Sequence, residues 1–190
     1  MGMMIVSFEP TASTLMLPPM DDPLFNIVLW QPQIPQNTGN IGRTAMATHC
    51  RLHVIHPIAF DMDEKACRRA GLDYWEHVDC REHKSWEAYL LRETPKRLWL
   101  FTTKSDRPHW KADFQQGDHL LFGQEQGGIS PEIHEWVSAT FGIDHRITFP
   151  MIAAQSARSL NLATAVACGV YEGLRQISLA TGRMPAAYDL

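Results

Sequence analysis

The chain has 190 residues, 45% of them hydrophobic and 20% charged, so it fits one compact domain and is too short for two ordinary ones. Seventeen Lys and Arg against 21 Asp and Glu give a net charge of −4 and a pI near 6.1. This balance argues against a protein that coats nucleic acid nonspecifically, although it leaves room for a local basic patch that grips a few phosphates.

The cysteines and the first residues indicate a compartment. The four cysteines, Cys50, Cys67, Cys80 and Cys168, form no CxxC pair and no disulfide framework, which predicts reduced thiols and a cytoplasmic location. No Lys, Arg or His precedes Arg43, and no apolar run approaches the roughly 18 residues of a spanning helix. We therefore expect no targeting signal and no membrane association.

Residues 1–23 contain four prolines and little periodicity, which predicts a flexible N-terminal extension. A single domain is expected over residues 24–180, followed by a C-terminal tail over 181–190. Within the domain, short apolar runs alternate with helical segments, which is typical of an α/β fold with a mostly parallel sheet flanked by helices. Strands are expected at 26–30, 51–56, 97–103, 119–122 and 146–149. Helices are expected at 37–49, 63–71, 84–92 and 131–136, with a last helix that begins at Ser159 or Asn161.

The last helix carries the clearest pattern. One apolar face with i, i+3/i+4 spacing contains Ala163, Val166, Ala167, Val170, Leu174 and Ile177. Its small residues would permit close approach of a partner helix. Packing within one subunit explains the pattern equally well.

Three unusual segments each follow a strand. The first is Asn37-Thr38-Gly39-Asn40-Ile41-Gly42-Arg43, in which Asn37 can cap the helix and Asn40 and Arg43 share a helical face. Without context, such a face is more often a solvated surface than a site. The second is Leu121-Phe122-Gly123-Gln124-Glu125-Gln126-Gly127-Gly128, a strand that runs into a glycine-rich loop. The third is Ile147-Thr148-Phe149-Pro150-Met151, followed by residues 156–163.

The glycine-rich loop lies where open α/β folds bind ligands, at the carboxyl edge of the sheet. Its spacing fits neither GxGxxG nor GxxxxGK[ST], which excludes a Rossmann dinucleotide site or a P-loop. Glu125 is a candidate base, but we favour a structural role in which it bonds nearby backbone amides and, with Asn37 and Gly127, shapes the loop.

Taken together, the three segments resemble the SPOUT methyltransferases, and specifically the small tRNA (cytidine/uridine) 2′-O-methyltransferases of the wobble position. The resemblance covers residues 24–178 and includes NIVLWQPQIPQNTGNIGRTA, RRAGLDYWE, TTKS, FGQEQGG and ITFPM. The run RRAGLDYWE points to the wobble subgroup. Two features depart from the family pattern: the loop before Asn161 is a residue or two longer than usual, and residues before 24 have no counterpart.

The resemblance implies a deep C-terminal trefoil knot, S-adenosyl-L-methionine as cofactor without a metal, and the tRNA anticodon stem-loop as substrate. It also implies a homodimer whose active site is built across the interface. The cofactor contacts carried over by position are Phe101, Gly123, Phe149 and Ser159, with Leu121 and Leu160 nearby.

The resemblance assigns the key catalytic role to Arg43. Because the pKa of a guanidinium exceeds about 12, it is a poor base. We therefore expect Arg43 to clamp an RNA phosphate, with Arg158 as a second anchor. Asn40 and Asn161 would orient groups around the reacting ribose.

A basic turn contains Lys65, Arg68 and Arg69. It is either a solvated helix face or a contact to the phosphates of the anticodon stem. Trp75 and Trp86 offer rings for base stacking, although core packing is the more usual role.

A metal site is not expected, because His53 and His56 would point to opposite faces of a strand and no Cys or carboxylate cluster joins them. Two alternatives to wobble methylation stay open: methylation of another tRNA or rRNA ribose, and a non-catalytic module that binds RNA or cofactor.

Overall fold

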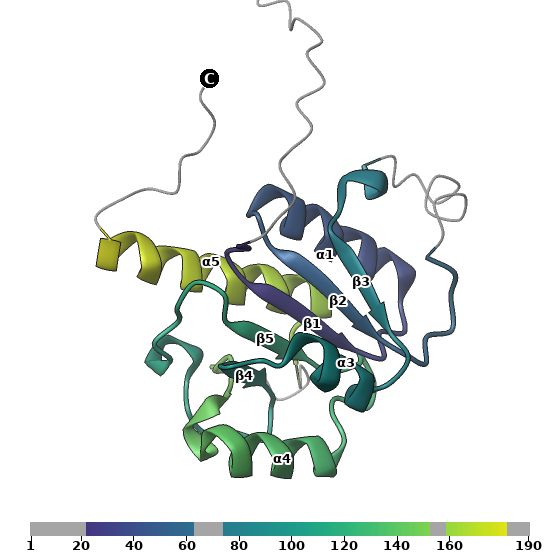
Figure 1. The fold of residues 1–190 in the computed structure, drawn as a ribbon. Helices are drawn as coiled ribbons and strands as arrows, with labels where there is room; N and C mark the ends of the chain where they lie inside the picture. The colour runs from purple at the N-terminus through teal and green to yellow at the C-terminus, as the bar shows by residue number, and fades with distance from the viewer. Residues whose placement is uncertain (1–21, 63–73, 153–158, 182–190) are drawn as a thin grey trace, which may run out of the picture.

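A single parallel sheet forms the centre of the molecule. The computed structural model describes residues 22–62, 74–152 and 159–181. Within them, six strands lie in the order β3-β2-β1-β5-β4-β6, and every neighbouring pair is parallel (Figure 1). The strands are β1 (Asn26–Trp30), β2 (Arg51–Ile55), β3 (Cys80–His83), β4 (Leu98–Phe101), β5 (His119–Phe122) and β6 (Arg146–Ile147).

Helices cover both faces of the sheet and give three layers (Figure 1). One face carries α1 (Pro35–Ala47) and α5 (Leu162–Thr181), and the other carries α3 (Trp86–Glu93) and α4 (Pro131–Phe141). Three short 3₁₀ helices, η1 (Trp75–His77), η2 (His109–Lys111) and η3 (Ile143–His145), lie in the connections.

Two apolar cores follow from the alternation of side chains along the strands. In β1, Ile27 and Leu29 pack under α1 and α5, whereas Val28 packs under α3 and α4. Trp75 and Trp86 are 9% and 7% exposed and belong one to each core. The core role considered for both tryptophans is therefore the one that the structure shows.

The last helix packs within the subunit. Val166 and Val170 are fully buried, and a Cβ on Gly173 would lie 2.5 Å from Cζ of Phe25. The small residues of α5 thus allow close contact with the sheet of the same chain. Its exposed face carries Cys168 and Tyr171.

The expected elements agree with the structure where hydrophobic periodicity is strong. The strands 26–30 and 119–122 have the expected bounds, and the sheet is parallel as predicted. The strand β3, with the sequence CREH, was missed, because it is a polar edge strand with no apolar alternation. Helix α4 continues to Phe141 rather than Trp136, since Val137 extends its buried face.

Several expectations depend on undescribed parts of the chain. The helix at 63–71 and most of the two terminal segments lie outside the described residues. The predicted threading of the C-terminal segment depends on residues 153–158, which also lie outside them. Among the described helices, none has both the length and the apolar character to cross a bilayer.

Candidate active site

A cavity of about 520 Å³ lies at the carboxyl ends of β4 and β5, within the size range of small-molecule sites. The loops after these strands meet there with the start of α1 and the segment before α5. The lining residues are Ile34, Asn37, Phe101–Lys104, Phe122–Ile129, His134, Thr148, Phe149, Met151, Ser159–Leu162 and Ala165. All three segments singled out in the sequence therefore contribute to one cavity.

Stacked aromatic rings form one wall of this cavity. The rings of Phe101 and Phe122 have centroids 4.4 Å apart and an interplanar angle of 12°, and Phe149 lies 5.2 Å from Phe101. A Cβ on Gly169 of α5 would lie 2.9 Å from Cζ of Phe101, so a larger residue there would force the Phe101 ring to shift. The wall offers an apolar, aromatic surface to the cavity.

The glycine-rich loop closes on itself. Gln124 and Gly128 exchange two backbone hydrogen bonds of 3.0 Å, and Gly128 has a φ of +66°. A Cβ on Gly123 would lie 2.4 Å from the carbonyl carbon of Gly128. The loop therefore needs glycine at both positions for a turn this tight.

Glu125 joins this loop to the start of α1. Its carboxylate accepts hydrogen bonds from the backbone N–H of Gln33 (2.8 Å) and Ile34 (3.2 Å) and from Nδ2 of Asn37 (2.9 Å). No side chain within α1 caps its N-terminus, which begins with Pro35. A carboxylate from the loop thus supplies the negative charge that a helix N-terminus favours.

Asn161 extends the same network to α5. Its Nδ2 donates to Oδ1 of Asn37 (3.0 Å), and its Oδ1 accepts from the backbone N–H of Ala163 (3.0 Å) and Thr164 (3.2 Å). Asn161 therefore caps α5 while it contacts α1. The expectation that Asn37 caps α1 is wrong, because Pro35 starts the helix two residues earlier and leaves Asn37 to bridge Glu125 and Asn161.

On the α4 side, a second network orients Thr102. Nδ1 of His134 lies 2.9 Å from the carbonyl oxygen of Ser130, so it carries the proton, and Nε2 accepts from the hydroxyl of Thr102 (2.9 Å). Burial lowers the pKa of His134, which favours this neutral ring. Sequence reasoning missed both residues, since only the fold brings α4 to the end of β4.

The cofactor contacts expected from the sequence fall mostly in the cavity. Phe101, Gly123, Phe149, Ser159 and Leu160 all line it. Leu121 does not: it is fully buried in the core under α3 and α4, because neighbouring residues of a strand face opposite sides. Phe122 lines the cavity instead.

Asn40 and Arg43 lie on exposed turns of α1 outside the cavity lining. The guanidinium of Arg43 lies over the ring of Tyr74, 4.5 Å from its centroid, and the Tyr74 hydroxyl donates to the carbonyl oxygen of Gly39 (2.9 Å). A Cβ on Gly42 would lie 2.5 Å from the ring of Trp75. The glycines of this segment therefore serve contacts with the 74–75 segment, which holds Arg43 on its ring.

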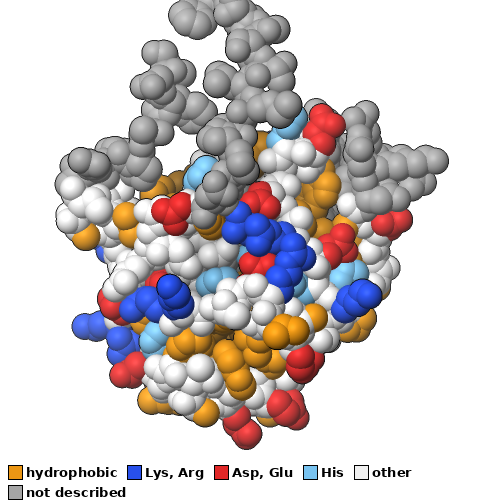
Figure 2. Space-filling model, in the orientation of Figure 1, with side chains coloured by type: hydrophobic (Ala, Val, Ile, Leu, Met, Phe, Trp, Pro, Cys, Tyr) orange, Lys and Arg blue, Asp and Glu red, His pale blue; other side chains and the backbone are white. Residues whose placement is uncertain are grey.

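The proposed RNA contacts are only partly visible. Lys65, Arg68, Arg69 and Arg158 lie outside the described residues. On the face in Figure 2, Lys and Arg side chains are interspersed with Asp and Glu and form no extended basic surface. This distribution agrees with the net negative charge.

His53 and His56 lie in different surroundings. His56 lies beyond the end of β2 and contacts Glu82 (Nε2–Oε2 2.7 Å). His53 is buried and faces His83 and Glu93. His53 and His56 do not share a site, and the neighbours of His53 come from elsewhere in the chain: parallel pairing places β3, with His83, beside β2.

A parallel α/β sheet with a glycine-lined cavity at its carboxyl edge places this chain in the class of open α/β proteins, which bind their ligands at that edge. The model of the SpoU rRNA Methylase family matches residues 24–171. The chain belongs to this family.

Two of the three similar proteins described next are close to this chain in length. A tRNA (cytidine(34)-2′-O)-methyltransferase from Saccharophagus degradans is 42% identical over 157 residues, which cover 83% of this chain and 98% of the relative. A structure described as giving insights into the 2-OH methylation of C/U34 on tRNA is 42% identical, with a TM-score of 0.69, and the match covers 84% of this chain and 97% of that one. The SpoU methyltransferase AviRb from Streptomyces viridochromogenes, in complex with AdoMet, is 25% identical, with a TM-score of 0.61, and the match covers 82% of this chain and 61% of that one.

Proposed function

We propose that this protein methylates the ribose 2′-O of the wobble nucleotide, C34 or a modified U34, in the tRNA anticodon loop. The observation that carries the proposal is the family match, together with 42% identity along nearly the whole length of a protein named for this reaction. The meeting of the three loop segments in one cavity supports it.

S-adenosyl-L-methionine is the proposed cofactor. When bound, it supplies an electrophilic methyl group. The residues present fit it: the stacked phenylalanines offer an apolar wall for the adenine ring, and the glycine-rich turn from Gly123 to Gly128, which carries no bulky side chain at its two ends, lines the same cavity. Phe101, Phe149, Ser159 and Leu160 would hold it alongside Gly123. Methyl transfer to a hydroxyl by this route uses no metal.

We assign Arg43 to the RNA. Its charge and planar fork suit a bidentate contact with a phosphate, and its stacking on Tyr74 limits the orientations that it must lose on binding. The contact would hold the ribose in line for attack and stabilise the developing alkoxide. Asn40, one turn before Arg43 on the same exposed helix face, would orient the ribose.

A homodimer would bring Arg43 to the cavity. In one subunit Arg43 and Asn40 are outside the cavity lining, so a second subunit is the proposed source of the pair at each site. Exposed apolar side chains at the cavity support contact with a second subunit there. Three lining residues carry them: Ile34 is 42%, Met151 37% and Leu160 36% exposed. An exposed apolar rim is typical of an interaction site.

The remaining assignments follow from the network and the family. Asn161 acts by positioning, since its amide is occupied by Asn37 and the α5 backbone. Arg158, Lys65, Arg68 and Arg69 stay proposed RNA contacts. The domain over residues 24–180 would contain the trefoil knot and would work in the cytoplasm, where tRNA is found.

The test is to map ribose methylation by mass spectrometry in RNA from a strain that lacks the gene. Loss of the 2′-O-methyl group at position 34, restored by the gene, is the expected result. Loss at another tRNA or an rRNA ribose would transfer the activity to that substrate. An unchanged pattern would leave only a binding role and reject the proposal.

A further inference from the structure

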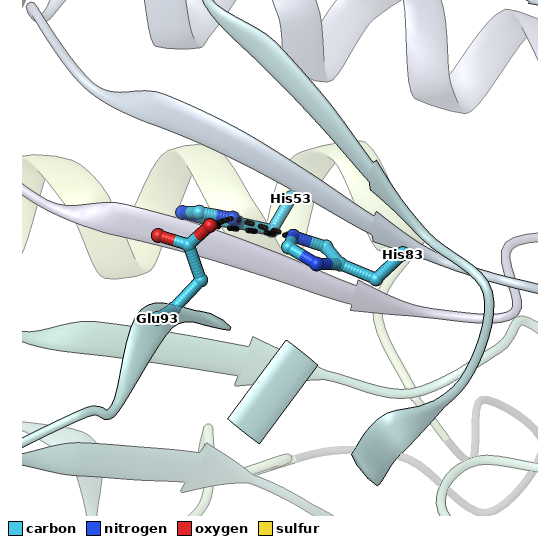
Figure 3. A group of neighbouring side chains, drawn as sticks. All are labelled: His53, His83 and Glu93. Carbon is cyan, nitrogen blue, oxygen red and sulfur yellow. Dashed lines mark hydrogen bonds and ion pairs between the residues drawn. The ribbon is translucent and has the colours of Figure 1, made fainter. Parts of the chain in front are cut away.

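A buried cluster of two histidines and one glutamate lies on the α3 side of the sheet, and none of its members lines the cavity. Nδ1 of His53 is 3.0 Å from Nε2 of His83, and Oε1 of Glu93 is 3.9 Å from the first and 3.8 Å from the second (Figure 3). His53 is 0% and His83 3% exposed, and the side chain of Glu93 is 7% exposed.

The parallel register brings the cluster together. His83 of β3 pairs with Ile55 of β2, two residues beyond His53, so both histidines project from the same face. Glu93 is the last residue of α3, which packs on that face. Three separate elements therefore direct one nitrogen or oxygen atom each toward a common point.

The surrounding bonds fix which nitrogen of His53 has a free lone pair. Nδ2 of Asn26 donates to the carbonyl oxygen of Gly117 (3.0 Å), so Oδ1 of Asn26 accepts, and Nε2 of His53, 3.1 Å away, must carry the proton. Nδ1 of His53 is then the acceptor that faces His83.

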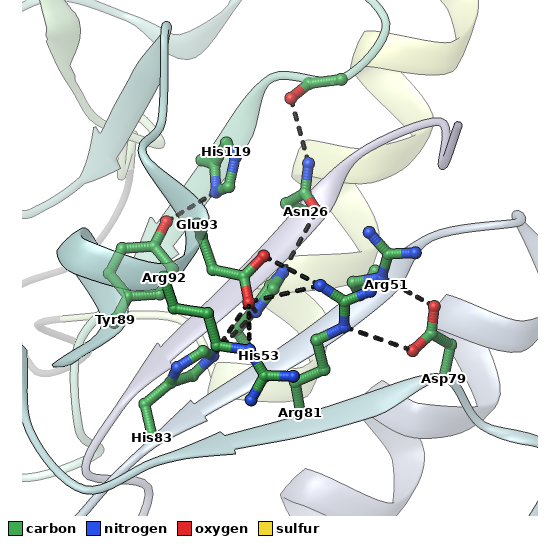
Figure 4. Close-up of polar contacts among 11 residues, drawn as sticks. Asn26, Arg51, His53, Asp79, Arg81, His83, Tyr89, Arg92, Glu93 and His119 are labelled. Atoms are coloured by element: carbon green, nitrogen blue, oxygen red, sulfur yellow. Dashed lines mark hydrogen bonds and ion pairs between the residues drawn. The ribbon is translucent and has the colours of Figure 1, made fainter. Parts of the chain in front are cut away.

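This arrangement has the form of a metal ligand with its outer support. Metal-bound histidines usually donate their second ring N–H to an oxygen, as His53 does to Asn26. Glu93 is held likewise, because NH1 of Arg81 donates to Oε2 at 3.1 Å and also to Oε1 at 3.3 Å (Figure 4). Metal–ligand bonds of about 2.0–2.2 Å place tetrahedral ligands roughly 3.3 Å apart. The three observed separations bracket that value, so shifts of a few tenths of an ångström would suffice.

In the metal-free protein, arginine side chains supply the positive charge beside Glu93 that a metal cation would supply. Nε of Arg92 lies 3.4 Å from Oε1, the oxygen directed at the histidines. The Arg92 side chain is 58% exposed, so it can swing into solvent and open a route to the cluster. Arg81, 32% exposed, would give up its 3.3 Å contact with Oε1 and keep its 3.1 Å contact with Oε2.

We propose that His53, His83 and Glu93 form a site for a divalent transition-metal cation of the Zn²⁺ type. Nδ1 of His53, Nε2 of His83 and Oε1 of Glu93 are the protein ligands, and water takes a fourth position where Arg92 now lies. Binding requires His83 to carry its proton on Nδ1 instead of Nε2, with no net proton loss. The cation would fasten the edge strand β3 and the end of α3 to the sheet.

The test uses the full chain after chelator treatment, titrated with Zn²⁺ by calorimetry and with Co²⁺ by visible absorption. One ion per chain, a Co²⁺ spectrum typical of tetrahedral N/O ligation and a raised Tm are the expected results. His83→Gln and Glu93→Gln should each weaken Zn²⁺ binding by roughly 100-fold or more. Arg92→Ala should strengthen it, because a competing cation is removed.

The matched control is His56→Gln, which removes a half-exposed histidine near the end of the same strand. It should leave Zn²⁺ affinity unchanged, and loss of binding in this variant would assign the ion to the surface. Equal Zn²⁺ affinity in wild type and in folded His83→Gln, or the absence of a Co²⁺ spectrum in the wild type, would overturn the proposal. Circular dichroism of the chelator-treated variants separates ligand loss from unfolding.

Discussion

Replacing Glu125 by Gln tests whether the glycine-rich loop is held by the start of α1. The carboxylate accepts three hydrogen bonds, two through Oε1 and one through Oε2. The amide of Gln can keep its oxygen toward Ile34 and Asn37, but its NH₂ group then faces the N–H of Gln33. One charge-assisted bond and the negative charge at the N-terminus of α1 are lost.

The expected cost is about 2 kcal/mol. A hydrogen bond to a charged group contributes about 1.5–3 kcal/mol, with the lower end suited to a half-exposed residue, and the helix-dipole term adds about 0.3–1 kcal/mol. For a chain of this size, each kcal/mol corresponds to about 2–4 °C, so Tm should fall by about 4–8 °C. Because the loop lines the cavity, S-adenosyl-L-methionine affinity should also fall, roughly tenfold if 1.4 kcal/mol of that loss appears in binding.

The assays are thermal unfolding of the ligand-free protein and calorimetric titration with S-adenosyl-L-methionine. Glu135→Gln is the matched control, since it removes one exposed carboxylate from α4 and should change neither quantity. If Glu125→Gln keeps wild-type Tm and cofactor affinity yet loses methyl transfer, Glu125 acts in the chemistry and the capping argument is refuted.

Three further predictions concern other parts of the site. Arg43→Lys keeps the charge but loses the planar fork, so kcat/KM for tRNA should fall roughly 10- to 100-fold. The cofactor affinity, measured by calorimetry, should stay constant. Full turnover by this variant would remove Arg43 from the mechanism. Gly123→Ala places a Cβ against the backbone of Gly128, so cofactor affinity should fall at least about tenfold, and normal binding would show that the loop can open. Cys50 is 1% exposed, and burial raises its pKa to about 11. Peptide mapping after iodoacetamide treatment at pH 8 should therefore find Cys50 unmodified in the folded protein. The exposed Cys168 should react unless a second subunit covers it.

The sequence predicts those strands that form short, continuous apolar runs. The runs at β1 and β5, in which every residue except Trp30 is buried, are typical of strands of a parallel sheet, and their predicted bounds are correct. β3 carries Cys80-Arg81-Glu82-His83, whose polar character reflects its place at the sheet edge. Edge strands bury little, so hydrophobicity gives them a weak signal.

The sequence predicts which loops form the cavity, because it predicts where the strands before them end. Loops that follow parallel strands gather at one edge, which is why Gly123, Phe149 and Ser159 meet in the cavity. Which face a residue occupies within a strand depends on register, and a one-residue difference separates Leu121 in the core from Phe122 at the cavity. Side-chain contacts such as that between His53 and His83 depend on strand order, which sequence spacing does not reveal.

The bridge from Asn161 through Asn37 to Glu125 gives the chain an order of assembly. Proteins emerge from the ribosome N-terminus first, so β1, α1 and the loop at 123–128 exist before residues 159–165 have been synthesised. The cavity has no wall from α5, and Asn37 no partner in Asn161, until that last helix docks. A nascent chain is therefore unable to hold the methyl donor, and added donor should protect only completed molecules from proteolysis.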